Sequence, residues 1–305
     1  MNRKKILIDT DIGDDIDDAF AMLFAMCEGV DIVGVTTVFQ NTPERARMAK
    51  KLLSLHGGRY ADVPVYFGYG NSAEHTCQYT PDLEDAAYAP NGNCPEDAID
   101  FIIECCEKYR NELTVVAIGP FTNIARAAQK SPEALSHVGE IVIMGGAYFR
   151  QYADWNVWCD PQAAKTMFES LCGIRCLGAD VTHLLRLSAE DDAKILNYSG
   201  KNPAVGYVKE LYRLWKAESR GSLGVLHDPL ALLCAIAPTY CHYKSAPVAV
   251  VTEGFARGMT VDIDEYGKAP LNADYKSFDF EKKQELAYSV DRDAVIERFM
   301  RCFDQ

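Results

Sequence analysis

Six aspartates stand within ten residues near the start of the chain, directly after the short apolar stretch Ile6–Ile8. They lie in the segment DTDIGDDIDD (residues 9–18), and the apolar run Ala19–Cys27 follows at once. A helix N-terminus stabilises negative charge, so helix capping accounts for a few of these acids. The others would repel one another at the end of a buried strand and raise each other's pKa. A hard cation would relieve that repulsion, and calcium binds about six to eight oxygen ligands in crowded, irregular sites.

This acidic segment leaves two interpretations open, a metal site or a group of capping and solvated acids. Gly13 favours the metal site, because glycine permits the tight turn that would bring the acids toward one point. The spacing differs from that of a single-loop calcium site, in which acids alternate along one loop and a glutamate closes it. A metal bound here therefore needs further ligands from distant parts of the chain.

Residues 226–229, Leu-His-Asp-Pro, form a second segment whose side chains could take part in metal binding or catalysis. Asp228 stands where a helix would begin, so it could bind a metal or only cap that helix. His227 could act as a general acid, or could simply occupy a turn. The glycine-containing stretch Ser219–Gly224 precedes both residues and could form a mobile lid.

Other candidates directly follow apolar stretches that are typical of strands. Asn41 could hydrogen-bond a sugar hydroxyl or only shape a turn. Ile118 ends its stretch, and a backbone carbonyl is a good calcium ligand. Met144 is followed by two glycines, which let a ligand approach the backbone closely. Asp154 and Asn156 lie in the loop that comes next.

These candidates share one site only if the strands before them are parallel, and the element pattern predicts that they are. Strand-like apolar runs alternate with helix-like segments, which predicts a mostly parallel central sheet flanked by helices in one Rossmann-like α/β domain over residues 1–305. Ligands of such sheets bind beyond the carboxyl ends of the strands. The predicted strands are Ile6–Ile8, Ile32–Val38, Val63–Phe67, Leu113–Ile118, Ile141–Met144, Ile174–Leu177 and Val248–Val251, and helices are predicted at Ala19–Cys27, Glu44–Leu55, after Ser131-Pro132 and Asp160-Pro161, from Asp228-Pro229 to about Ala237, and at Asp291–Phe303.

Composition narrows the class of protein. The net charge of −13 argues against a nucleic-acid partner, because phosphates repel an acidic surface, and it suits a small neutral substrate or a bound cation. No apolar run approaches the roughly 20 residues that span a bilayer, and no secretory signal is recognisable, so a cytoplasmic location and no membrane partner are expected. The eleven cysteines are scattered and odd in number, which indicates free core thiols.

Taken together, these segments resemble the inosine-uridine preferring nucleoside hydrolase family over nearly the whole chain. Each segment alone is a weak signal, whereas their occurrence in this order is specific. The matching pieces are Asp9-Thr-Asp11-x-Gly with Asp17-Asp18-Ala19, Gly34-Val-Thr-Thr-Val38 with Asn41, Gly119-Pro-Phe-Thr-Asn-Ile-Ala125, Met144-Gly-Gly146, Asn156 before Asp160-Pro161, His227-Asp228-Pro-Leu-Ala231 and Gly258-Met-Thr-Val-Asp262.

The resemblance implies the nucleoside hydrolase fold, a homodimer or homotetramer, and calcium-dependent hydrolysis of the N-glycosidic bond of ribonucleosides. It implies calcium ligands at Asp11, Asp18, the Ile118 carbonyl and Asp228, and ribose contacts from Asp17, Asn41 and Asn156, with Met144 and Asp154 beside the substrate. Asp11 would be the general base, and His227 would protonate the leaving base, a task that its ordinary pKa of about 6.5 suits. Calcium would orient the sugar and acidify a water molecule.

The chain also departs from the family pattern. Two extra residues lie between Gly13 and the pair Asp17-Asp18, so Asp14 or Asp15 could instead join the metal ligands. Asp154-Trp-Asn156 stands where the family has Glu-Phe-Asn, and a His-Gly-x-x-Gly segment is not recognisable. These changes leave the hydrolase chemistry in place and put the usual inosine and uridine preference in doubt.

Two rival functions remain open at this stage. A phosphatase of the haloacid dehalogenase type also begins with a strand and Asp-x-Asp, and it would use Asp9 as nucleophile and magnesium as cofactor. It gives no role to His227 or Asp228 and normally has Thr or Val where Gly13 stands. The other rival is a non-catalytic protein that binds calcium and a nucleoside.

Overall fold

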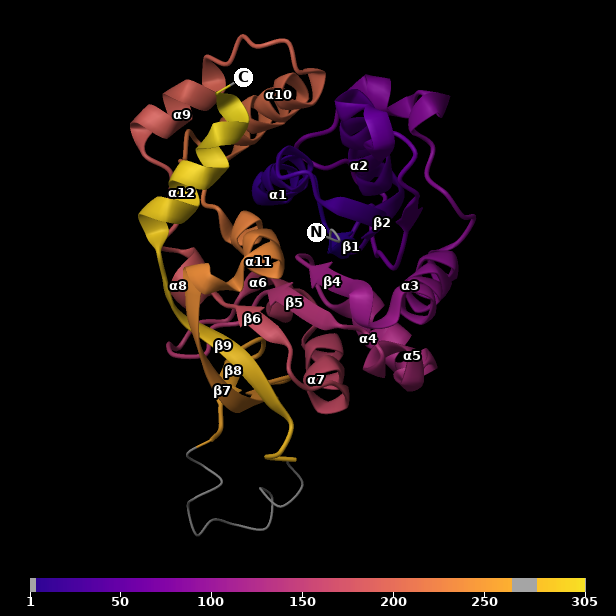
Figure 1. Ribbon diagram of the computed structural model, residues 1–305, viewed down its shortest axis with the longest axis vertical. Coiled ribbons are helices and arrows are strands. Elements are labelled where there is room, and N and C mark those ends of the chain that lie inside the picture. The colour runs from indigo at the N-terminus through magenta and orange to yellow at the C-terminus, as the bar shows by residue number, and fades with distance from the viewer. Residues whose placement is uncertain (1–3, 265–278, 305) are drawn as a thin grey trace.

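The computed structural model describes residues 4–264 and 279–304. Strands from both parts of the described chain join in one sheet of nine, as the sequence pattern predicts for an α/β domain (Figure 1). The strands are β1 (Lys5–Thr10), β2 (Asp31–Thr37), β3 (Val65–Phe67), β4 (Leu113–Ala117), β5 (Glu140–Met144), β6 (Arg175–Leu177), β7 (Cys241–Val250), β8 (Thr260–Asp262) and β9 (Lys283–Val290).

The strand order explains why residues distant in sequence can share a site. The sheet runs β3-β2-β1-β4-β5-β6-β9-β7-β8, so β1 lies between β2 and β4. All pairs from β3 to β9 are parallel, and only β7 runs antiparallel to its neighbours β9 and β8. The carboxyl ends of β1, β2, β4 and β5 therefore lie along one edge of the sheet, and the residues that follow them meet there.

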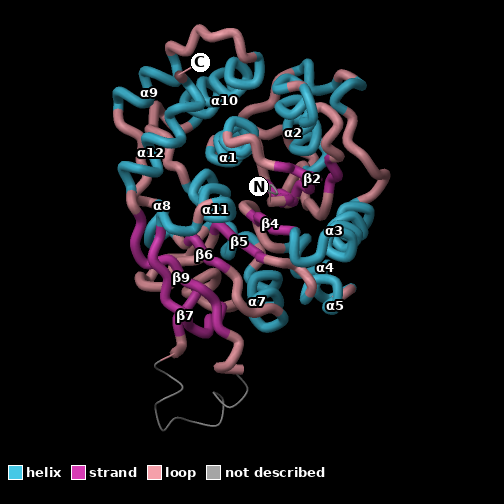
Figure 2. Tube along the Cα trace, viewed as in Figure 1, coloured by secondary structure: helices cyan, strands magenta, loops and turns pink. Residues whose placement is uncertain are grey.

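Helices cover both faces of the sheet because alternate residues of each strand point to opposite sides. Along β1, Ile6 and Ile8 belong to one buried cluster and Leu7 to the other. The helices are α1 (Asp17–Cys27), α2 (Thr42–His56), α3 (Pro95–Tyr109), α4 (Thr122–Lys130), α5 (Pro132–Ser136), α6 (Trp155–Cys159), α7 (Pro161–Ser170), α8 (Ala179–Thr182), α9 (Ala189–Leu196), α10 (Pro203–Glu218), α11 (His227–Ile236) and α12 (Arg292–Met300). Figure 2 shows α11 on one side of β4 and β5 and α4 and α7 on the other, whereas β7 and β9 extend beyond these helices.

The two clusters divide the helices between the faces. The cluster that contains Ile6 and Ile8 draws on α1, α2, α10, α11 and α12, and the cluster that contains Leu7 draws on α3, α4 and α7. The helix α1 is buried along almost its whole length, which explains why every residue after Asp17 and Asp18 is apolar. It packs against α11, so the N-termini of two helices that are about 200 residues apart in sequence come together.

The predicted strands and helices are present, with differences at the C-terminal end of the sheet. The strand predicted at Val248–Val251 begins earlier, at Cys241, and β9 was not predicted. The sequence of β9, KQELAYSV, begins with polar residues, yet Gln284 is fully buried. Its side chain pairs with the backbone of Leu171 and Ile174, so a polar residue stands where the pattern requires an apolar one.

Two predictions from composition can be compared with the described chain. All eleven cysteines lie within it and are free thiols, as predicted, but only six are buried in the core. The prediction of core thiols is wrong for the exposed Cys27, Cys94 and Cys172 and for the half-buried Cys77 and Cys159. Among its helices, none has both the length and the apolar character that a bilayer crossing requires.

Candidate active site

A cavity of about 460 Å³ opens at the carboxyl edge of the sheet, where the strand order brings the candidate residues together. It collects side chains from the loop after β1, from the ends of β4 and β5, and from the starts of α1, α6 and α11. Its lining comprises Asp11, Asp14, Asp15, Asp17, Asp18, Ile118, Met144, Tyr152, Asp154, Trp155, Asn156, His183, Trp215, His227 and Asp228.

Four buried carboxylates form what we call the acidic floor of this cavity: Asp11, Asp17, Asp18 and Asp228. One carboxylate oxygen from each of Asp17, Asp18 and Asp228 lies within 4.8 Å of the other two. Helix α1 begins at Asp17 and α11 begins at His227, so the packing of these two helices creates the cluster. The side chain of Asp228 does not cap α11, which leaves its carboxylate to the cavity.

The acidic floor is electrostatically unfavourable without a cation. Burial raises the pKa of Asp11, Asp17 and Asp228 well above the ordinary value, and repulsion from neighbouring carboxylates adds to the rise. Burial likewise raises the pKa of Asp18 to about 7, although a hydrogen bond from Thr10 opposes the rise. Carboxylates with oxygens this close are the ligand set of a hard divalent ion, so the residues present fit a metal.

Hydrogen bonds fix the shape of the acidic floor. The Asp18 carboxylate accepts from the hydroxyl of Thr10 and from the backbone N–H of Asp11, the latter at 3.2 Å. The backbone N–H of Ile12 donates to the Thr10 hydroxyl at 3.1 Å. The end of β1 is thus bound to the first turn of α1, which fixes Asp11 relative to Asp18.

Asn156 connects the floor to the ends of two strands. Its Nδ2 donates to the carbonyl oxygens of Ile118 (2.7 Å) and Met144 (3.1 Å), so its side-chain oxygen is the atom that can serve a ligand. A carbonyl oxygen has two lone pairs, and the Ile118 carbonyl can therefore accept a second contact. Asp154 caps α6 by accepting from the backbone N–H of Asn156, and burial raises its pKa to about 6.

His227 lines the cavity from the start of α11, far in sequence from the end of β1. Its Nδ1 is 2.7 Å from the hydroxyl of Thr182, which leaves Nε2 for a ligand. Burial, together with His183 and Arg186, lowers the pKa of His227 to about 3. The ordinary pKa expected from the sequence therefore does not apply here, and the ring is neutral at pH 7.

Two predicted residues have other engagements. Asn41 is absent from the cavity lining, because its side chain caps α2 and its Nδ2 donates to the carbonyls of Ala73 and Glu74. Asp15 lines the cavity, yet its carboxylate accepts from the backbone N–H of Ile16 at 2.6 Å and is not in the three-residue cluster.

The rival nucleophile Asp9 is excluded from the cavity. It is fully buried, and one carboxylate oxygen accepts from Thr36 (2.6 Å) and Asn123 (2.8 Å). Burial raises its pKa to about 7. A carboxylate in this position cannot attack a phosphate in the cavity, so its role is to join β1 to β2 and α4.

Sequence reasoning missed the aromatic side of the cavity, which we call the aromatic rim: Tyr152, Trp155, His183 and Trp215. The rings of His183 and His227 meet edge to face at 5.2 Å, and Tyr152 packs against His183 at 5.3 Å. Trp155 stands between the predicted residues Asp154 and Asn156, which was a usable signal. Trp215 gave none, because an aromatic residue on an amphipathic helix such as α10 is usually a core residue.

Comparison with known proteins identifies the family and agrees with the fold. Residues 6–297 match the family model of inosine-uridine preferring nucleoside hydrolases. Uridine nucleosidase 1 of Arabidopsis thaliana is 34% identical over 278 residues, 85% of this chain and 81% of that protein. A plant nucleoside hydrolase structure has a TM-score of 0.82 with 26% identity, and a purine-preferring ribonucleoside hydrolase from Gardnerella vaginalis has a TM-score of 0.79 with 26% identity; each comparison covers 98% of both chains.

Proposed function

The chain belongs to the nucleoside hydrolase family, and we propose that it hydrolyses the N-glycosidic bond of ribonucleosides with calcium held on the acidic floor. The reaction gives ribose and a free base. The observation that carries the proposal is the convergence of Asp17, Asp18 and Asp228 in the cavity that Asp11 also lines.

Calcium is proposed because the available ligands are all oxygens and their arrangement is irregular. Asp11, Asp18, Asp228 and the Ile118 carbonyl would hold the ion, with Asp15 as an alternative ligand and Asp17 directed to the sugar. When bound, the ion would supply positive charge that orients the ribose hydroxyls and makes a nearby water molecule more acidic.

Asp11 is the proposed general base. Cleavage of the C1′–N bond builds positive charge on the ribose, and a water molecule must lose a proton as it adds to C1′. Asp11 is buried at the end of β1 and its backbone is fixed to Asp18, so its carboxylate has a defined position for that proton. Asp17 and Asn156 are proposed to hold the ribose hydroxyls, beside Met144 and Asp154.

His227 is the proposed donor to the departing base. Its lowered pKa means that the neutral ring, with a hydrogen on Nε2, would donate a hydrogen bond to the base as negative charge develops there. The contact from Thr182 to Nδ1 orients the ring for that task. Asn41 is also proposed to contact the ribose, as the family resemblance implies. This contact requires that a bound nucleoside replaces the hydrogen bonds from the Asn41 amide to the carbonyls of Ala73 and Glu74.

One assay tests the proposal. The purified protein is incubated with a panel of purine and pyrimidine nucleosides, and free base is measured with a strong chelator and after calcium is restored. We expect base release that the chelator abolishes and calcium recovers. Full activity in the metal-free protein would overturn the metal-centred mechanism, and binding of nucleosides without release of base would favour the non-catalytic alternative.

The oligomeric state and the cellular location of the protein stay predictions. A homodimer or homotetramer is proposed from the family resemblance, and a cytoplasmic location stays a prediction. Sedimentation of the purified protein tests the first and fractionation of the source cells the second.

A further inference from the structure

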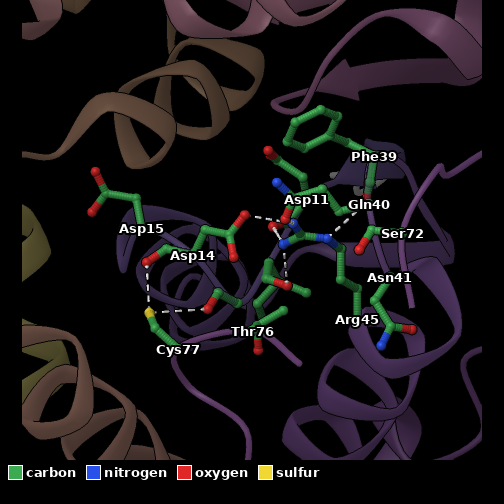
Figure 3. Close-up of polar contacts among 12 residues, drawn as sticks. Asp11, Asp14, Asp15, Phe39, Gln40, Asn41, Arg45, Ser72, Thr76 and Cys77 are labelled. Carbon is green, nitrogen blue, oxygen red and sulfur yellow. Dashed lines mark hydrogen bonds and ion pairs between the residues drawn. The ribbon is translucent and has the colours of Figure 1, made fainter. Parts of the chain in front are cut away.

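Arg45 is a fully buried cation that the proposed reaction does not use. It belongs to α2, and its charge lies beneath the loop after β1 that carries the acids (Figure 3). Burying an arginine is costly unless each of its donors finds a partner. The contacts of this side chain therefore indicate what it does.

The guanidinium uses all five of its N–H groups on two loops. On the loop after β1, Nη1 donates to the carbonyls of Asp11 and Ile12, the latter at 3.0 Å, and Nη2 donates to the Asp14 carboxylate at 2.6 Å. On the loop after β2, Nε donates to the Phe39 carbonyl at 2.8 Å and Nη2 to the Gln40 side chain at 3.2 Å.

Both loops have an unusual backbone conformation. Gly13 has φ 128°, which glycine adopts freely, whereas Phe39 and Gln40 have φ 68° and 52° in a region that residues with a side chain rarely adopt. At Phe39 and Gln40 this conformation persists only where surrounding contacts hold it. All five donors of Arg45 contact these two loops, so its side chain joins the loops into one unit.

A second set of contacts holds the acidic loop from the other side. The Sγ of Cys77 lies 3.2 Å from the carbonyl oxygen of Asp14, and Nε2 of Gln78 donates to the Asp15 carbonyl at 2.7 Å. Figure 3 shows the Asp14 carboxylate directed toward Arg45 and Asp15 pointing away from it. The two residues by which this loop exceeds the family pattern are thus held by α2 on one side and by residues 77–78 on the other.

From these contacts we propose that Arg45 is a positioning residue: its planar fork sets the backbone at Asp11 for metal binding and keeps the Asp14 carboxylate off the ion. This inference rests on the proposed function, because it assumes that Asp11 and its neighbours bind calcium. It makes the Asp14 carboxylate an ion-pair partner of Arg45, and so excludes Asp14 from the metal ligands that the sequence left open.

The charge of Arg45 and its geometry predict opposite effects of its replacement on calcium affinity, so the two roles can be distinguished. Removal of a positive charge beside a cation site should strengthen calcium binding if only charge matters. Loss of the fork should weaken binding, because residues that orient metal ligands typically contribute about 10–100-fold in affinity. Lysine at this position keeps the charge and cannot reproduce the fork.

The experiment is calorimetric titration of calcium into chelator-treated protein at about pH 8, without nucleoside. We expect Arg45→Met to weaken calcium binding by about tenfold or more, and Arg45→Lys to weaken it despite its charge. Arg47→Met is the matched control, because Arg47 lies on the same helix and donates to the carbonyls of Leu83 and Asp85, away from the acidic loop. Its affinity should equal that of the wild type.

Each outcome has a defined meaning. Wild-type protein that binds no calcium would overturn the proposed function, whereas unchanged or tighter binding by Arg45→Lys and Arg45→Met would overturn only the role of Arg45. If Arg45 served stability alone, the folded Arg45→Lys protein would bind calcium normally at a lower Tm. If Arg45→Met does not fold, Arg45→Lys and Asp14→Asn together decide the question. A loss of calcium affinity of about a hundredfold in Asp14→Asn would show that Asp14 is a metal ligand and would overturn the assignment. A small change in its calcium affinity supports the assignment.

Discussion

The acidic floor and the aromatic rim of the cavity are built in opposite ways. The aspartates of the floor are at most 7% exposed and stand at a strand end or in the first turn of a helix, where backbone contacts fix them. In the rim, Tyr152 is 40% exposed and Trp155 54% exposed. A change in the floor alters elements that pack in the core, whereas a change in the rim alters side chains that face solvent.

We expect this difference to separate the residues that carry the chemistry from those that select the base. The relatives include one named for uridine and one named for purines. We therefore expect variants of the floor to change turnover and variants of the rim to change affinity for the base. The following predictions test that separation, from the largest expected effect to the smallest.

Asp11→Asn should lower kcat by roughly three orders of magnitude or more, because the amide cannot accept the proton of the attacking water. The fold should persist, since a neutral amide replaces an acid that its neighbours repel. Release of free ribose measures turnover, and thermal unfolding followed by circular dichroism checks the fold. Near-normal turnover in a folded variant would reject Asp11 as the base.

His227→Phe should lower kcat for nucleosides by about a hundredfold, because the leaving base loses its hydrogen-bond donor. The same variant should cleave p-nitrophenyl riboside nearly as fast as the wild type, since p-nitrophenolate departs without a proton. Parallel assays of the two substrates measure the effect. Equal losses on both would show that His227 acts on the sugar or the fold instead of on the leaving group.

Trp155→Ala should raise KM by about tenfold and change kcat little, because stacking of an aromatic side chain on a base is worth about 1–3 kcal/mol. Trp158→Ala is the matched control: it lies on α6, stacks on Trp155 at 5.2 Å and does not line the cavity. Steady-state kinetics on a purine and a pyrimidine nucleoside provide the readout. A fall in kcat with KM unchanged would place Trp155 with the chemistry and weaken the separation of floor and rim.

Calcium should raise the Tm by a few degrees more at about pH 8 than at about pH 5. Burial raises the folded-state pKa of Asp18 from 3.8 to about 7, so its contribution to stability is present below about pH 4 and is lost as the pH rises through 7. Calcium favours the ionised form and restores that stability, while protons compete with it at low pH. Differential scanning calorimetry with calcium or chelator at both pH values measures the effect, and an increment independent of pH would contradict it.

The sequence by itself determined the sheet, most of its strands and the edge at which ligands bind. The reason is local: apolar runs of strand length, proline at helix starts and acids directly after β1 each reflect short-range physical chemistry. Strand order brings Asp11, Asp18 and Ile118 to one edge of the sheet, and a β-α alternation restricts that order to few possibilities, whereas Asp228 was expected there from the family resemblance.

Only the tertiary structure decided how each polar group is used. From the sequence, Asn41 and Asp228 could each cap a helix or bind a ligand. In the folded chain Asn41 caps α2, whereas Asp228 caps no helix and lines the cavity. Asp11, Ile12 and Asp14, which accept from Arg45, and the two residues that lower the pKa of His227 lie more than 30 positions away in sequence, and no local pattern encodes such contacts. Burial and contact with distant segments set the charge and orientation of a side chain, and those are properties of the folded chain alone.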